Sequence, residues 1–368
     1  MEVGFLLEQC LAPVPGGTGR YSREVAAALA RFGPAGSVHG VVALHREVSA
    51  ATVPGVVGPR RLPLPRRALV AAWERGRGPA VPGDVVHAPT PLAPARRRRP
   101  LVVTVHDAVP WTHPETLTPR GVRWHRAVVE RAARTADLVV VPTQAVAAEL
   151  GRHVHLTADR LLVVGEGVSG DLALPHDAPE RAARLALPER YLLTVATLEP
   201  RKGLAELIAA LGRPGAPDLP LLCAGQPGWG GSDPLRLAAA AGLPAGRVRL
   251  LGRVPDGDLA VLLDRATALV VPSRAEGFGL PLLEAMAAGV PVLASTAPAL
   301  VEVAGGAALH SSLAPDGLAE ALAEVVGDEG LRERLRQAGR QRATAYTWDG
   351  AARQLWSAYS ALPAGRAG

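Results

Sequence analysis

The sequence contains almost no cysteine, since Cys10 and Cys223 are the only two in 368 residues. So few cysteines exclude a disulfide framework and a cysteine-based zinc site, and they are typical of a reducing compartment. Long apolar runs are also missing, because none reaches the roughly 18 residues that span a membrane as a helix. The N-terminal stretch contains Glu2 and Glu8 and no basic leader, so we expect no signal peptide. These absences together predict a cytoplasmic protein.

Aromatic residues make up only 4% of the chain, which affects how the net charge of +6 is interpreted. Such a charge would suit a nucleic acid. However, the densest basic run, residues 96–99, lies between Pro94 and Pro100 without interleaved aromatics or a recognition module, so we expect no nucleic-acid partner. An anionic membrane surface, an anionic acceptor and a plain role in solubility all stay open for this run. A membrane contact would place the protein at the inner face of the membrane.

Short apolar segments alternate with amphipathic ones along the whole chain. We expect strands at residues 3–7, 38–44, 84–88, 101–105, 136–141, 161–164, 191–196, 221–224, 248–251, 269–271 and 291–294. Helical spacing lies between and after them, at residues 21–32, 123–134, 204–211, 281–288, 316–326, 330–346 and 348–362. This order predicts an α/β protein with parallel sheets, and the length suffices for two domains.

Proline and charge mark the boundary between the two halves. Residues 169–188 contain three prolines and many charges, so we expect a linker there. We therefore expect one domain at residues 1–170, a second at 188–346 and a terminal helix within 347–368. Upstream, residues 45–83 are rich in Pro and Arg, and only a helix around Trp73 can be predicted there.

The most informative stretch is residues 269–293, LVVPSRAEGFGLPLLEAMAAGVPVL. After a buried strand and a glycine-containing loop, Pro281 suits the first turn of a helix that ends at Gly289. Glu276 then precedes the helix, and Glu284 lies near its beginning. A helix N-terminus favours an anion, so two carboxylates beside it indicate that the ligand also presents uncharged hydroxyls, as a sugar does. Solvated glutamates on a surface helix are the alternative, but they leave the Gly-Phe-Gly-Leu-Pro loop unexplained.

Two cations follow the first predicted strand of the second half. Arg201 and Lys202 precede a helix, so they lie beside a helix N-terminus. This placement suits a diphosphate, because arginine can bind two of its oxygens and lysine adds a point charge. A solvated basic turn is the alternative.

A glycine-rich segment follows the first strand of the chain. Gly17-Thr18-Gly19 precedes the predicted helix, where backbone N–H groups can hold a phosphate. The dinucleotide fingerprint would need a third glycine at Ser22, so this segment is weak evidence for NAD.

His106 and Asp107 follow a buried strand. Ligands of an open parallel sheet gather beyond the carboxyl ends of its strands, so His106 is a candidate site residue. Asp107 could fix its ring, although adjacent side chains on a strand point apart. A histidine satisfied at a strand end is the alternative.

Asp256-Gly257-Asp258 has the spacing with which some transferases hold a divalent cation. It also precedes a predicted helix, where Asp caps free N–H groups. Since Arg201 and Lys202 already offer positive charge for a diphosphate, we predict helix capping and no metal.

The stretch EGFGLPLLEAMAAGVPVL resembles the donor-binding signature of retaining glycosyltransferases of the GT-B fold, the glycosyltransferase group 1 or family 4 enzymes. The resemblance covers the second half closely and the first half loosely. It implies two Rossmann-like parallel-sheet domains that face a cleft, with a terminal helix crossing back to the first domain. Two departures are Gly203, where many relatives carry Asn, and Val301, where relatives carry Pro.

The same resemblance implies a role for each candidate residue. Glu276 would contact the transferred sugar, and Glu284 the ribose hydroxyls of the nucleotide. Arg201 and Lys202 would bind the diphosphate. Backbone contacts to the donor are implied for Gly277, Phe278, Gly279 and Leu280 and for Gly17, Thr18 and Gly19, while Arg253 and Val254 would lie against the base. His106-Asp107 followed by Pro110 resembles a mannosyltransferase-like branch, in which the histidine reaches the sugar.

The resemblance therefore predicts transfer of a sugar, with retention, from a nucleotide-diphospho donor. GDP-mannose is the expected donor, and UDP-sugars are the alternative. The acceptor is not readable, and we expect no cofactor. A glycogen-phosphorylase-like enzyme would need a cofactor lysine motif that is missing from the sequence. A non-catalytic sugar-nucleotide binder stays open, because it would use the same residues.

Overall fold

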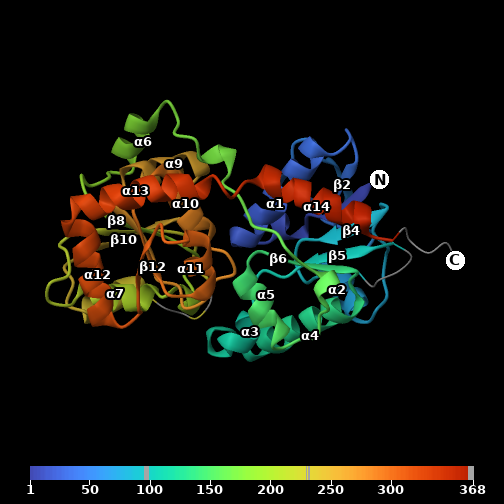
Figure 1. Cartoon of the computed structure of the whole chain (residues 1–368), viewed down its shortest axis with the longest axis horizontal. Coiled ribbons are helices and arrows are strands. Elements are labelled where there is room, and N and C mark those ends of the chain that lie inside the picture. The colour runs from blue at the N-terminus through green and yellow to red at the C-terminus, as the bar shows by residue number, and fades with distance from the viewer. Residues whose placement is uncertain (95–98, 229, 231–232, 364–368) are drawn as a thin grey trace. The chain divides into compact units, whose positions relative to one another are not determined.

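The computed structural model describes residues 1–94, 99–228, 230 and 233–363, and it divides into two compact units. The first unit contains Met1–Gly167 and the C-terminal segment from Thr347, and the second contains Val168–Tyr346. Helix α14, red in Figure 1, therefore belongs with the blue and cyan elements. Of the basic run at 96–99, residues 96–98 lie outside the described residues, and Arg99 donates a hydrogen bond to Asp84.

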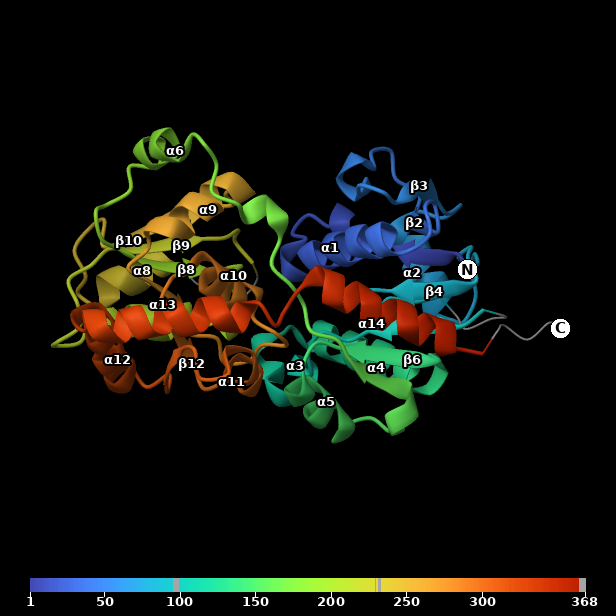
Figure 2. The ribbon, with the colours of Figure 1, turned by 45° about the horizontal axis from the view of Figure 1, so that its top comes forward.

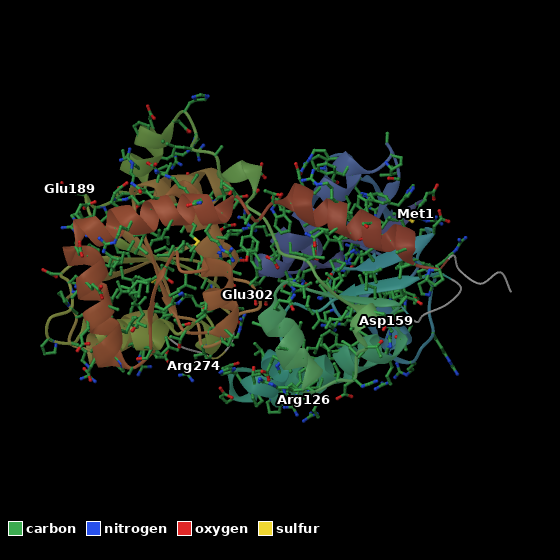
Figure 3. All side chains as sticks on the ribbon, in the orientation of Figure 1. Met1, Arg126, Asp159, Glu189, Arg274 and Glu302 are labelled. Carbon is green, nitrogen blue, oxygen red and sulfur yellow. The ribbon has the colours of Figure 1, made fainter. Side chains whose placement is uncertain are left out.

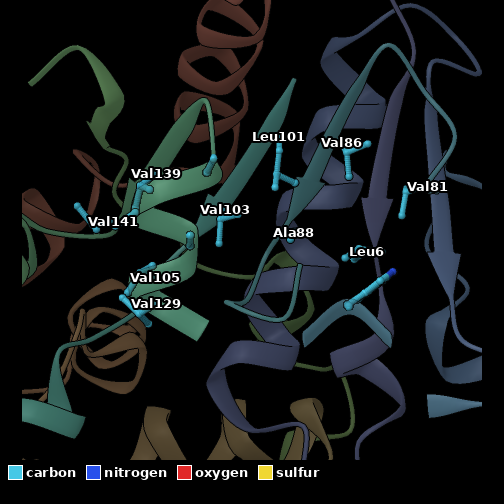
Figure 4. Close-up of a cluster of buried hydrophobic side chains, with 14 of the residues drawn as sticks. Leu6, Val81, Val86, Ala88, Leu101, Val103, Val105, Val129, Val139 and Val141 are labelled. Atoms are coloured by element: carbon cyan, nitrogen blue, oxygen red, sulfur yellow. The ribbon is translucent and has the colours of Figure 1, made fainter. Parts of the chain in front are cut away.

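The first unit is built on a seven-stranded sheet with the order β3-β2-β1-β4-β5-β6-β7, in which every pairing is parallel. Its strands are β1 (Val3–Leu6), β2 (Val38–Val42), β3 (Val57–Arg61), β4 (Val85–Ala88), β5 (Leu101–Thr104), β6 (Leu138–Val141) and β7 (Leu161–Val163). The central strands consist mainly of buried Val and Leu, as expected for a parallel sheet covered on both faces. Figure 4 shows this core, with Val103, Val139 and Val141 on neighbouring strands.

Helices cover this sheet. They are α1 (Gly16–Phe32), α2 (Arg66–Glu74), α3 (Val109–Thr112), α4 (Pro119–Thr135), α5 (Gln144–Gly151) and α14 (Trp348–Ala361). The C-terminal helix α14 packs along α1, and Trp356 Nε1 donates to the Leu29 carbonyl at 3.0 Å. Tyr359 on the same helix is buried and contacts His87 of β4. The chain end is thus part of the core of the first unit.

The second unit is built on a six-stranded parallel sheet with the order β10-β9-β8-β11-β12-β13. Its strands are β8 (Leu192–Val195), β9 (Leu221–Ala224), β10 (Val248–Gly252), β11 (Ala268–Val271), β12 (Val292–Ser295) and β13 (Leu309–Ser311). Its helices are α6 (Ala178–Arg184), α7 (Leu204–Leu211), α8 (Pro234–Ala240), α9 (Asp256–Arg265), α10 (Leu280–Ala288), α11 (Pro298–Ala304), α12 (Pro315–Gly327) and α13 (Glu329–Ala343). Helix α13 packs on α10, as Figure 2 shows.

The structure differs from the sequence-based expectation in several places. The predicted linker at 169–188 contains α6, which packs on α9 inside the second unit. Strand β3 was not predicted, because VGPRR has no apolar run and is mostly exposed at the sheet edge. Gly17–Gly19 lie in the first turn of α1 instead of in a turn before it. Among the described residues, no helix is long and apolar enough to cross a membrane.

Candidate donor site

The strand order of the second unit reverses between β8 and β11. From β8 the chain continues through β9 to β10 on one side, and β11 is followed by β12 and β13 on the other. Ligands of open parallel sheets bind beyond the carboxyl ends of the strands at such a switch point. The turn after β8 carries Arg201 and Lys202, and the loop after β11 carries Glu276. The predicted cation pair and the predicted carboxylate Glu276 therefore lie together at the switch point.

Gly203 lets these two segments approach each other. It ends the short helical turn Pro200–Lys202 with φ of +67°, and a Cβ atom there would lie 1.8 Å from the Pro272 carbonyl oxygen. A side chain at this position would push the turn away from the β11 loop. The contact is reinforced by the Arg274 N–H, which donates to the Arg201 carbonyl at 2.8 Å.

Glu276 is held from several sides. Lys202 Nζ lies 2.6 Å from its Oε1, and Arg201 lies 3.2 Å from its Oε2. Ser273 Oγ also donates to Oε1, at 2.7 Å. Burial alone would raise the pKa of Glu276, but the charges of Lys202 and Arg201 and the hydrogen bonds from Lys202 and Ser273 lower it to about 2. Glu276 is therefore an ionised, fixed hydrogen-bond acceptor at neutral pH.

Glu199 completes this cluster, although no sequence motif pointed to it. Its buried Oε1 accepts a hydrogen bond from Arg201 at 3.0 Å. Burial raises the pKa of Glu199, and Arg201 and Lys202 oppose that shift. The signal available in the sequence was its place in the same turn as the two cations. Ser273 was missed as well, since a serine after a strand has no distinctive pattern.

Helix α10 begins directly beyond the Glu276 loop. Its N-cap is Gly279, with φ of +98°, and a Cβ there would lie 2.5 Å from Leu300 Cδ2. No acidic residue lies in its first turn, so its N–H groups present positive potential to an anion. Phe278 anchors the loop, because it is buried and packs edge-on against Tyr346 with ring centroids 5.3 Å apart. Glu284 is buried one turn into the helix.

Arg253 and Val254 follow β10, whose carboxyl end lies at the same edge of the sheet. Arg253 is exposed and Val254 is half-buried. The structure therefore places them on the predicted edge of the sheet, two strands away from β8 and three from β11, which precedes the Glu276 loop.

In the first unit, His106 follows β5 and is surrounded by polar and aromatic groups. Its Nε2 lies 2.8 Å from the Pro89 carbonyl oxygen, and its Nδ1 lies 3.7 Å from Glu166 Oε1. The Tyr21 ring packs edge-on against it with centroids 4.6 Å apart. Burial alone would lower the pKa of His106, but Glu166, the Pro89 carbonyl and Asp107 raise it above its ordinary value.

The sequence left open whether Asp107 fixes the His106 ring, and its hydrogen bond goes elsewhere. Asp107 Oδ1 accepts from the Val109 N–H at 3.1 Å, because consecutive side chains leave the strand in different directions. The carboxylate facing His106 belongs to Glu166, which follows β7. Its place after a predicted strand was the only signal for it.

Asp258 does not cap α9, contrary to the expectation. The N-cap position is Pro255, without a side-chain cap, and Asp258 lies in the first turn. Its Oδ1 accepts hydrogen bonds from Arg181 at 2.7 Å and Arg184 at 2.9 Å, both on α6. Asp258 therefore joins two helices. Within the described parts of the chain, no three His, Cys, Asp or Glu residues are grouped so that they could hold a metal ion.

Two parallel-sheet units of this kind occur in the GT-B fold of glycosyltransferases, and solved structures share this fold. Sucrose-phosphate synthase from Thermosynechococcus elongatus matches with a TM-score of 0.76 and 22% identity over 98% of both chains. WaaG, a glycosyltransferase involved in lipopolysaccharide biosynthesis, matches with a TM-score of 0.71 and 20% identity over 98% of this chain and 100% of its own. The predicted fold class is confirmed.

The family follows from the sequence comparison. Residues 15–171 match the model of Glycosyltransferase Family 4, and residues 178–342 match that of Glycosyl transferases group 1. O-antigen chain mannosyltransferase B of Escherichia coli is 32% identical over 76% of this chain and 74% of its own. Phosphatidyl-myo-inositol mannosyltransferase of Mycobacterium leprae (strain TN) is 30% identical over 82% of both chains. The chain belongs to the group 1 glycosyl transferases, and it is a glycosyltransferase of the mannosyltransferase-like branch.

Proposed function

We propose that the protein transfers mannose from GDP-mannose with retention, giving an α-linkage to a glycan, lipid-linked or small-molecule acceptor. The observation that carries the proposal is Glu276, an ionised carboxylate held by Lys202 and Arg201 at the switch point of the second sheet. A carboxylate accepts hydrogen bonds from sugar hydroxyls, and the two cations beside it suit a diphosphate. The two relatives named above as mannosyltransferases support mannose as the sugar.

We propose that the second unit binds the departing nucleoside diphosphate. Breaking the bond between the sugar and the phosphate leaves negative charge on the diphosphate, which Arg201, Lys202 and the α10 N-terminus would stabilise. Glu276 would position the sugar and Glu284 would accept hydrogen bonds from the ribose hydroxyls. Further donor contacts are assigned to the backbone of Gly277, Phe278, Gly279 and Leu280, to Arg253 and Val254, and, on the first unit, to His106, Gly17, Thr18 and Gly19.

The stereochemical route follows from the lack of a convincing nucleophile among the proposed site residues. In a same-face substitution, the acceptor oxygen bonds to the anomeric carbon as the sugar–phosphate bond breaks. The acceptor proton passes to the departing phosphate oxygen, so no covalent sugar–enzyme intermediate forms. The anomeric configuration of the donor is then kept in the product.

We further propose that residues 1–170 form the acceptor side, residues 188–346 bind the donor, and the segment 347–368 completes the first domain. The enzyme would act in the cytoplasm, with a peripheral contact to the inner face of the membrane. The basic run at 96–99 supports that contact by its charge, which would attract acidic headgroups.

The test is a panel of GDP-mannose and UDP-sugars, measured by thermal shift and by slow release of nucleotide without acceptor. We expect GDP-mannose to raise the melting temperature most and to be hydrolysed. Stronger stabilisation by a UDP-sugar would identify a UDP-sugar as the donor in place of GDP-mannose. Binding without any turnover would favour a non-catalytic sugar-nucleotide binder. NMR of the transfer product should show an α-linkage, and a β-linkage would refute retention.

A further inference from the structure

The His106 ring lies between two acceptor groups of the first unit. Nε2 faces the carbonyl oxygen of Pro89 at 2.8 Å, and Nδ1 faces the Glu166 carboxylate at 3.7 Å. A carbonyl oxygen can only accept, so Nε2 carries a proton and donates it to Pro89. The His106 side chain is only 17% exposed and that of Glu166 only 5%, so solvent screens this arrangement weakly.

The state of Nδ1 decides the charge of the ring. A neutral ring with its proton on Nε2 has a lone pair on Nδ1, which would point at a carboxylate and be repelled. A proton on Nδ1 turns that repulsion into attraction between an imidazolium and a carboxylate. The 3.7 Å separation is too long for a direct hydrogen bond, so the interaction is an ion contact.

The other titratable groups around His106 do not supply a competing charge. His87 of β4 is buried. Its burial, and to a lesser extent the charge of His106, lowers its pKa to about 3, so the His87 ring is neutral. Burial raises the pKa of Tyr21 on α1, so its hydroxyl keeps its proton. Asp107 is a second carboxylate that raises the pKa of the ring, and its Oδ1 accepts a hydrogen bond from the Val109 N–H.

We propose that Glu166 is a positioning residue of the transfer reaction, which holds His106 in place as an imidazolium. A doubly protonated ring cannot accept a proton, so His106 does not act as a general base. A positively charged ring suits the anionic diphosphate of the donor, to which the proposed function assigns His106. The role of Glu166 in the transfer reaction rests on the proposed function. The charge of His106 in the unliganded protein does not.

The first test measures the charge state directly. Ring resonances of isotope-labelled histidines are followed by NMR through a pH titration of the unliganded enzyme, and His106→Asn assigns the His106 signal. We expect His106 to titrate above the ordinary histidine value in the wild type, and lower in Glu166→Gln. Glu149→Gln is the matched control, because Glu149 on α5 pairs with His153 at 3.0 Å in the same unit.

The second test uses the pH dependence of transfer. If His106 must be charged, the alkaline limb of the kcat/KM profile moves to lower pH in Glu166→Gln, so activity falls several-fold more at about pH 8 than at about pH 6. Glu166→Asp should restore part of the profile, and Glu149→Gln should leave it unchanged. A variant that merely folds poorly would lose activity equally at both pH values.

Two results would overturn the proposal. One is a wild-type His106 that titrates at or below the ordinary value, which needs no variant. The other is an unchanged His106 titration in folded Glu166→Gln. If the titration shifts as expected but no sugar nucleotide is turned over, the proposed function fails and the ion contact stands.

Discussion

Lys202 Nζ and Glu276 Oε1 lie 2.6 Å apart, although 74 positions separate the two residues in the chain. The pair joins the turn after β8 to the loop after β11, two strands that are neighbours in the sheet. Because both side chains are mostly buried, the pair is fixed before any donor arrives. Preorganised charge of this kind stabilises a transition state without further reorganisation.

Removing the charge of Glu276 should therefore affect turnover. In Glu276→Gln the side chain keeps its size, but Lys202 and Arg201 lose their carboxylate partner. We expect kcat to fall roughly ten- to hundredfold, the scale of a lost charged hydrogen bond, with donor KM changing less. Glu206→Gln is the control, since Glu206 pairs with Arg274, labelled in Figure 3, at the surface of the same unit. Wild-type turnover in Glu276→Gln would remove this residue from the reaction.

The same cluster should make the fold sensitive to acid. The folded-state pKa of Glu276, about 2, lies below its ordinary value of 4.5. A group whose pKa is depressed by folding contributes stability above its unfolded pKa, and that stability is lost as pH falls toward the folded value. The free energy of unfolding should therefore fall between about pH 4.5 and 2, and fall less steeply in Glu276→Gln. Equal slopes for both proteins in urea unfolding would contradict the ionised state.

Glu284→Ala should weaken donor binding. We place its carboxylate on the ribose hydroxyls, and loss of a charged acceptor costs about 1.5–3 kcal/mol, or roughly ten- to hundredfold in donor KM. Glu320→Ala, at an exposed position on α12, is the control. Circular dichroism should show an unchanged fold, and an unchanged donor KM in the Glu284 variant would place the nucleotide elsewhere.

The local sequence pattern was sufficient to predict many helices and strands. It was not sufficient to predict which distant segments pair with one another. The predicted helix at 204–211 and the strand at 221–224 agree with α7 and β9, because apolar spacing is a local property. The sequence placed Lys202 and Glu276 each beside a helix, yet their contact depends on β8 and β11 being neighbours. Strand order is set by packing of the whole unit, so a local pattern does not contain it.

The same limit applies to the partners of charged residues. Asp107 was the nearest carboxylate to His106 in the sequence, but the one that faces the ring, Glu166, comes from the end of another strand. Asp258 has the position of a capping residue, but two arginines of α6 bind it instead. Helix α6 itself could not be predicted, because prolines and charges dominate residues 169–188 and only Ala178 and Ala182 of this helix are buried.

The contact between α14 and the first sheet offers a test of the fold. Tyr359 Oη lies 2.5 Å from His87 Nδ1, and both residues are almost fully buried. Tyr359→Phe would leave that ring nitrogen without its partner, which costs about 1–3 kcal/mol. We expect a lower melting temperature with donor KM unchanged. Tyr346→Phe, in the second unit, is the matched control, and an equal melting temperature for wild type and Tyr359→Phe would show that α14 is not held in this way.

The last prediction concerns divalent metal. A diphosphate leaving group needs positive charge, and Arg201, Lys202 and the α10 N-terminus are assigned to supply it. The metal-like spacing at Asp256 and Asp258 serves another purpose, since Asp258 accepts from two guanidinium groups and holds α6 against α9. We therefore expect transfer to be unaffected by EDTA. Asp258→Asn should lower the melting temperature while kcat stays within about twofold of the wild type, because the substitution weakens a helix contact and leaves the donor site intact. An enzyme silenced by EDTA and restored by Mn²⁺ or Mg²⁺ would show that protein cations alone do not neutralise the leaving group.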